Sequence, residues 1–173
     1  MDNVDFYLYD LKTKFNKIDP HKYYLSYSGG KDSHLLYWFI KEYAKIDGIK
    51  IVGVNTYMEH QEILKRINEN CDVVLIPKLK PFQIKEKYGI PCFSKQQDEM
   101  IKRYQNGNRS NNTMNFILGI NPIYKLNKKA KTLLLENKLH KVSADCCKYL
   151  KKVTVHDFEK ETGLKPIMRC TWL

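Results

Sequence analysis

The sequence lacks the features that would place a chain in a membrane or direct it out of the cell. No apolar run in its 173 residues is long enough to cross a bilayer, and the first residues lack the pattern of a signal peptide. We therefore expect a cytoplasmic protein with no membrane partner. The length favours a single domain over residues 1–173, with a helical segment at its edge over residues 1–20.

Arginine is also scarce. Of the 30 Lys and Arg residues only four are arginines, while the formal net charge is +11. A basic protein favours anionic ligands and polyanions, but base readout and forked phosphate contacts favour arginine. Charge alone therefore supports a nucleic-acid partner bound through a basic surface, and the scarcity of arginine counts against it. A solvated, lysine-rich surface is the alternative.

Cysteine is present in an odd number, five, and no C-x-x-C pair occurs. In a chain without a secretory signal, this favours free thiols in a reducing compartment over a disulfide framework. Only Cys146 and Cys147 are adjacent.

Two common phosphate-binding motifs are missing: the chain has neither G-x-x-x-x-G-K-[ST] nor G-x-G-x-x-G. It has instead a short aromatic stretch, Tyr23–Tyr27, that is typical of a buried strand. Two glycines interrupt it, and apolar residues at helical spacing from Leu35 predict a helix. Asp32 or Ser33 can cap the first turn of that helix.

This strand–turn–helix junction predicts an anion site. Gly29 and Gly30 allow the backbone to approach a ligand closely, and the first amides of the helix point outward. Ser28 and Ser33 add hydroxyls, and Lys31 adds a positive charge. The ligand that fits is a phosphate or sulfate. A tight turn with no ligand is the alternative.

The six residues Ser28 to Ser33 resemble the SGG-x-DS signature of the PP-loop, or adenine nucleotide alpha hydrolase-like, superfamily. Lys31 at the fourth place, after an aromatic–Ser pair, most resembles the phosphoadenosine phosphosulfate (PAPS) reductase family. The likeness extends over about residues 23–168. It implies an adenine nucleotide ligand, namely ATP, adenosine phosphosulfate (APS) or PAPS, with Lys31 neutralising charge at the reacting group. Asp32 would cap the helix, or hold Mg²⁺ if ATP is the substrate.

A second set of candidate contacts follows the next predicted strand, Ile49–Asn55, where open α/β sheets place their ligands. Sulfonucleotide reductases carry an Asp-Thr pair and a later Glu here, and Asn55, Thr56 and Glu62 take similar places. Asn replaces Asp in this chain. With Ser26 in the first strand, these complete the candidate nucleotide contacts. For Glu62, helix capping is the alternative.

The Cys146–Cys147 pair, followed by Lys148, also resembles the PAPS reductase family. In the iron–sulfur branch of that family, such a pair and a distant C-x-x-C hold a four-iron cluster. Because C-x-x-C is absent, we do not expect a cluster from this chain alone. The pair could bind metal with other ligands or with another subunit, or be two small residues at the start of a helix.

The family's C-terminal Gly-x-Arg-like and Glu-Cys-Gly-Leu-His segments are absent, so the chain resembles a C-terminally shortened member. Reduction of a sulfonucleotide needs a sulfur nucleophile, and Cys170 is the only cysteine near this end. Two functions follow. The first is an enzyme acting on ATP, APS or PAPS, with Lys31 and Cys170 as catalytic candidates. The second is a catalytically degenerate binding or inhibitor protein that acts on a nucleic acid or protein partner, as a homodimer or heteromer.

The order of elements predicts a Rossmann-like, three-layer α/β/α fold with a mostly parallel sheet of about five strands. A capping box at Ser94 and Gln97 predicts a helix from there to about Tyr104. The predicted strands cover residues 23–27, 49–55, 72–76, 141–143 and 165–168.

Overall fold

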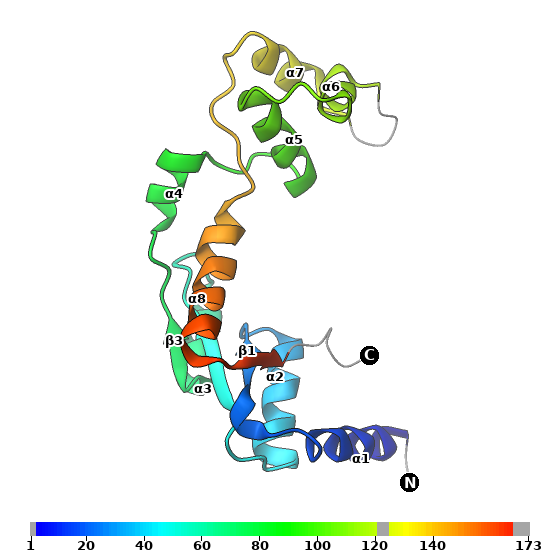
Figure 1. Cartoon of the computed structure of the whole chain (residues 1–173), viewed down its shortest axis with the longest axis vertical. Coiled ribbons are helices and arrows are strands. Elements are labelled where there is room, and N and C mark those ends of the chain that lie inside the picture. The colour runs from blue at the N-terminus through cyan, green and yellow to red at the C-terminus, as the bar shows by residue number, and fades with distance from the viewer. Residues whose placement is uncertain (1–2, 121–124, 168–173) are drawn as a thin grey trace. The chain divides into compact units, whose positions relative to one another are not determined.

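The computed structural model describes residues 3–120 and 125–167. The chain separates into two compact units (Figure 1). The first, here called the sheet unit, comprises Met1–Pro77 and Thr154–Leu173. The second, called the helical unit, comprises Lys78–Val153. In Figure 1 the sheet unit runs from blue through cyan to the first green, with its C-terminal part in orange and red, and the helical unit runs from green through yellow to orange. That the whole chain forms one domain stays a prediction.

The sheet unit is built on parallel strands. Within the described ranges the sheet has four strands in the order β3-β2-β1-β4, and each neighbouring pair is parallel. Their bounds are β1 Tyr23–Tyr27, β2 Lys50–Val54, β3 Val73–Leu75 and β4 Lys165–Ile167. The predicted α/β class with a parallel sheet is confirmed, with four strands in place of about five.

The missing strand is the one predicted at residues 141–143, and that prediction was wrong. This segment belongs to the helical unit and forms only an isolated parallel bridge between Ile90 and Val142. Two hydrogen bonds make the bridge: Ile90 N donates to Lys141 O at 3.1 Å, and Ser143 N donates to Ile90 O at 3.1 Å. The next donor of a parallel ladder would be Cys92 N, but it donates to the Asp98 carboxylate at 3.2 Å instead, so the ladder ends here.

Helices cover both faces of the sheet. Leu25 and Tyr27 point to one face, where they pack in a buried cluster with Ile67 of α3. Tyr24 points to the other face and packs edge-on against Phe158 of α8, with ring centroids 5.4 Å apart. This alternation follows from the two-residue period of a strand and gives the unit three layers. The helical segments are α1 Asn3–Phe15, η1 Pro20–Lys22, α2 Lys31–Trp38, η2 Phe39–Tyr43, α3 Gln61–Asn70 and α8 Val153–Thr162.

The helical unit has its own apolar core. Ile101, Ile117, Leu134 and Val142 are almost fully buried in it. Ser94 and Gln97 form the predicted capping box, in which Gln97 N donates to Ser94 Oγ at 3.3 Å. The helical segments are α4 Pro81–Tyr88, α5 Lys95–Gln105, α6 Asn111–Leu118, α7 Lys128–Leu135 and η3 Lys148–Lys152. Over the described part of the chain, no helix has the length and apolarity needed to cross a membrane.

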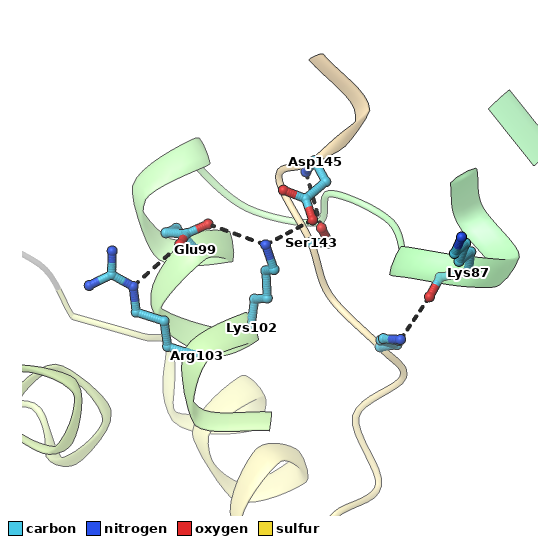
Figure 2. A network of polar contacts seen from close by, with 7 residues as sticks. Lys87, Glu99, Lys102, Arg103, Ser143 and Asp145 are labelled. Carbon is cyan, nitrogen blue, oxygen red and sulfur yellow. Dashed lines mark hydrogen bonds and ion pairs between the residues drawn. The ribbon is translucent and has the colours of Figure 1, made fainter. Parts of the chain in front are cut away.

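An ion pair ties the end of this unit to α5. Lys102 Nζ lies 2.8 Å from Asp145 Oδ2, as Figure 2 shows, and Asp145 N donates to Ser143 Oγ at 3.0 Å. Burial works to raise the pKa of Asp145, but the Lys102 ammonium and the Ser143 contact together hold it below its usual value. The segment after Val142 is therefore fixed by charge as well as by the bridge.

Candidate functional site

The Ser28–Ser33 loop lies where the strand order of the sheet reverses. From β1 the chain runs to β2 and then β3 on one side, and β4 pairs with β1 on the other side. In open α/β sheets, ligands bind beyond the carboxyl ends of the strands at such a switch point. The loop leaves the carboxyl end of β1 and enters α2 directly, as the sequence predicts.

Gly29 is required by both its backbone and its surroundings. Its φ is +73°, a conformation that residues with a Cβ rarely adopt. A Cβ at this position would lie 2.9 Å from Ile63 Cγ2 and 3.2 Å from the Ile63 carbonyl oxygen, both in α3. The loop is therefore folded tightly against the next helix, which fixes the path of its backbone.

Gly30 is the N-cap of α2, and no side chain makes a cap hydrogen bond there. This corrects the prediction that Asp32 or Ser33 caps the helix. The Ser33 hydroxyl is used elsewhere, since its Oγ donates to Gly30 O at 3.0 Å. Asp32 lies in the first turn, where the positive end of the helix dipole favours a carboxylate. The start of α2 thus keeps the backbone arrangement that suits an anion.

The two serine hydroxyls meet across the loop. Ser28 Oγ and Ser33 Oγ are 3.1 Å apart, and Ser28 N donates to Ser33 Oγ at 3.2 Å. The two hydroxyl oxygens therefore lie together at the loop, with the Ser33 hydroxyl donating to Gly30 O. A bound oxyanion would exchange the contact between them for hydrogen bonds to itself. Lys31, the first residue of α2, is exposed beside them and can bring its ammonium to the anion.

Asn55 and Thr56 follow β2, the strand next to β1, and stabilise the turn there. Thr56 is 2% exposed, and its N and Oγ1 donate to the Glu59 carboxylate at 2.8 Å and 2.6 Å. Asn55 Oδ1 accepts a hydrogen bond from Tyr57 N at 2.9 Å, and Tyr57 has a positive φ of 64°. The side chains of Asn55, Thr56 and Glu59 thus all make hydrogen bonds within this turn.

Glu62 and Ser26 lie on two different elements. Glu62 is exposed in the first turn of α3, and its N donates to the ring of the N-cap residue His60 at 3.4 Å. Ser26 pairs with Val52 in the sheet, and strand alternation puts it on the same face as Tyr24. Ser26 lies two residues before the Ser28–Ser33 loop, and Glu62 precedes Ile63, the residue against which Gly29 packs.

His34, next to the loop, is a candidate site residue that the sequence did not predict. His34 Nδ1 is 2.9 Å from Tyr27 Oη, and the His34 ring stacks on Tyr37 with an interplanar angle of 15°. Asn70 Nδ2 donates to Tyr27 Oη at 3.4 Å, and burial raises the pKa of Tyr27. The phenol therefore stays protonated and can donate to Nδ1, which puts the proton of the neutral imidazole on Nε2. The only signal in the sequence is that His34 follows Ser33.

Cys146 and Cys147 belong to no group of metal ligands in the described part of the chain. Cys146 is half-buried and Cys147 exposed, at the start of the helix that leads into η3. Among the described residues, no three His, Cys, Asp or Glu side chains come together as metal ligands. Cys170 lies outside the described residues.

An aromatic pair in the helical unit forms a second candidate surface. Tyr88 and Tyr149 stack with centroids 4.2 Å apart and an interplanar angle of 15°. Lys87 Nζ lies 5.4 Å from the Tyr88 ring, and Lys148 Nζ lies 5.2 Å from the Tyr149 ring. Each ring therefore has a cation beside it.

Comparison of the chain with protein-family models, curated proteins and solved structures finds no match.

Proposed function

We propose that the chain is a PP-loop protein of the PAPS reductase-like kind, which binds the phosphate or sulfate of an adenine nucleotide at the Ser28–Ser33 loop. The observation that carries the proposal is the backbone of Gly29. Its left-handed conformation, packed on α3, turns the chain from β1 into a helix that begins without a side-chain cap. This arrangement lies at the switch point of the sheet, where ligands of such folds bind.

Each residue of the loop has a role in this proposal. The amides at the start of α2 donate to the oxyanion, and the Ser28 and Ser33 hydroxyls close around it. Lys31 neutralises the charge that develops at the phosphate or sulfate. Asn55 and Thr56 shape the end of β2, the strand next to β1. If ATP is the ligand, Asp32 holds the accompanying Mg²⁺.

Turnover requires more than the loop. Reduction of a sulfonucleotide needs a thiol at the sulfate, and Cys170 is the candidate carried over from the sequence. Binding is therefore the core of the proposal, and reductase or nucleotide alpha-phosphate chemistry is its extension.

Titration calorimetry with ATP, AMP, APS and PAPS tests the proposal. We expect at least one of them to bind more tightly than inorganic sulfate. Lys31→Ala should weaken that binding about tenfold, the value of one charge-assisted hydrogen bond. Lys41→Ala is the matched control, because it removes the same charge from an exposed position in η2, away from the loop. Equal losses in the two variants, or no nucleotide binding tighter than sulfate, would overturn the proposal.

The Tyr88–Tyr149 stack favours a second candidate function, in which the chain is catalytically degenerate and binds a nucleic acid. Aromatic rings and nearby cations are the two elements of single-stranded nucleic-acid binding surfaces. The net charge of +11 supports attraction to a polyanion. This candidate does not exclude the first, because the stack lies in the helical unit and the Ser28–Ser33 loop in the sheet unit.

A further inference from the structure

Cys92 and His140 form a close pair in the helical unit. Cys92 Sγ lies 2.9 Å from His140 Nε2, although 48 residues separate the two along the chain. Both side chains are exposed. The Ile90 carbonyl oxygen is a more distant partner of the thiol, at 3.7 Å. The imidazole is therefore the main partner of the sulfur, and solvent can reach both groups.

The backbone around the pair is held in place on the cysteine side. The buried Asp98 carboxylate accepts hydrogen bonds from Cys92 N at 3.2 Å and Phe93 N at 2.9 Å. Gly89 allows the two segments to approach, since a Cβ there would lie 2.3 Å from Lys141 O. The isolated bridge between Ile90 and Val142 follows from that approach.

The histidine side is fixed by α5. Gln105 Nε2 donates to His140 O at 2.8 Å, and Val142 N donates to Gln105 Oε1 at 2.9 Å. A little further on, the Lys102–Asp145 ion pair of Figure 2 anchors the same segment. The pair is thus placed by two fixed backbone segments, and both of its side chains remain accessible.

The chemistry of this pair is that of a thiol with its own base. Partial burial, and then the Asp98 carboxylate, raise the pKa of the Cys92 thiol. At neutral pH the sulfur is therefore mostly protonated, and a nucleophilic attack needs a group that removes the proton. A neutral His140 with its Nε2 lone pair toward Sγ is such a group.

We propose that Cys92 and His140 form a nucleophilic thiol–imidazole pair that undergoes thiol–disulfide exchange with small disulfides, which makes Cys92 a reversible modification site. His140 Nε2 takes the thiol proton while Cys92 Sγ attacks one sulfur of the disulfide. A new S–S bond forms at Cys92 and the old one breaks. The leaving thiolate takes the proton back from the imidazolium. One thiol is consumed and one is released, so the exchange needs no other oxidant. It is independent of the proposed nucleotide site.

The test is the rate of mixed-disulfide formation with oxidised glutathione, followed by peptide mapping of the intact chain. We expect Cys92 to react about a hundredfold faster or more than the Cys146–Cys147 peptide, the lower end of what a positioned base contributes. Cys71 is the slow control, because burial raises its pKa to about 12. A Cys92 rate no higher than that of Cys146–Cys147 would overturn the proposal, and this comparison needs no variant.

His140→Gln then tests the base. The exposed ring makes its hydrogen bond to Cys92, so we expect circular dichroism to be unchanged. The Cys92 rate should fall to within about twofold of the Cys146–Cys147 rate, given the loss of the base. The rate at Cys146–Cys147 should not change. An unchanged Cys92 rate in a folded His140→Gln protein would contradict the role of the imidazole.

Discussion

Gly29 and Gly30 are neighbours in the chain, but only at Gly29 does the structure itself require the absence of a side chain. Gly29 has a φ of +73° and no space for a Cβ beside Ile63. Gly30 has an ordinary extended conformation, with φ −80°, and a Cβ there would meet only Ser28 Oγ at 3.5 Å. The first glycine is therefore structural. The second is free of such constraints, and in the proposed function it leaves room for the oxyanion.

This contrast gives a paired prediction. Gly29→Ala should lower the free energy of unfolding by about 1–3 kcal/mol, the cost of a strained left-handed residue. Gly30→Ala should cost about 1 kcal/mol or less, as a cap glycine replaced by alanine, but should weaken nucleotide binding. Urea unfolding and calorimetry measure the two effects. Equal stability of the two variants would contradict the structural role of Gly29. Full nucleotide affinity in Gly30→Ala would contradict close approach of the ligand to the backbone.

At the scale of elements, α5 holds the helical unit together through Lys102. The Lys102 and Asp145 side chains are 26% and 12% exposed, so water screens their ion pair little. By contrast, the ion pair of Lys138 with Glu136 is 69% and 47% exposed at its two side chains. Exposed pairs contribute little to stability, whereas a charge that loses its partner in a half-buried place is costly.

Lys102→Met should therefore lower the free energy of unfolding by about 1–3 kcal/mol at neutral pH, the value of a hydrogen bond to a charged group. Lys138→Met, the matched control, should change it by less than about 0.5 kcal/mol. The pKa of Asp145 is lower in the folded chain than in the unfolded one, so its contribution is complete above the unfolded value, about 3.9, and disappears as pH falls through the folded value. The difference between Lys102→Met and the unchanged chain should shrink in this acid range. A difference that stays constant down to low pH would contradict the ion-pair explanation.

The sequence predicted the elements that local patterns determine. The apolar runs of β1, β2 and β3, the glycine turn into α2 and the Ser94–Gln97 capping box are all patterns of a few consecutive residues. The strand prediction at 141–143 was wrong, because a short extended segment around one apolar residue, Val142, has the same local pattern in a sheet and in an isolated bridge. The bridge depends on contact with Ile90, which no local pattern reveals.

The candidate sites also differ in whether their residues are consecutive in the sequence. The Ser28–Ser33 loop could be identified because its residues are contiguous. The N-cap of α2 could not be predicted, because the Ser33 hydroxyl donates to Gly30 O, a partner that the sequence does not show. The Cys92–His140 pair joins residues far apart in the chain through a fold of the helical unit. Spacing alone therefore carried no signal for it.

At the scale of the whole molecule, charge is the main property that bears on partners. The formal net charge is +11, and lysines supply most of it. Such a surface attracts any polyanion, with a strong dependence on salt. The question is whether the Tyr88–Tyr149 stack makes this attraction specific to one place.

A charge-matched comparison answers it. We predict that a fluorescent single-stranded oligonucleotide binds at low salt and is released as salt rises. The double variant Lys87→Ala and Lys148→Ala should weaken binding more than Lys41→Ala with Lys50→Ala, which removes two exposed charges from the sheet unit. Fluorescence anisotropy at two salt concentrations measures both. Equal losses would show that only net charge matters and would remove the aromatic stack as a nucleic-acid site.

The measurement that tests the central claim most directly is a nuclear magnetic resonance titration of the nitrogen-15-labelled chain with PAPS and with ATP. If the start of α2 binds the oxyanion of an adenine nucleotide, the largest amide shift changes will be those of Gly29, Gly30 and Lys31. Inorganic sulfate will give smaller changes at the same residues. If the nucleotides leave these amides unshifted, or shift the helical unit most, the Ser28–Ser33 loop is not a nucleotide site.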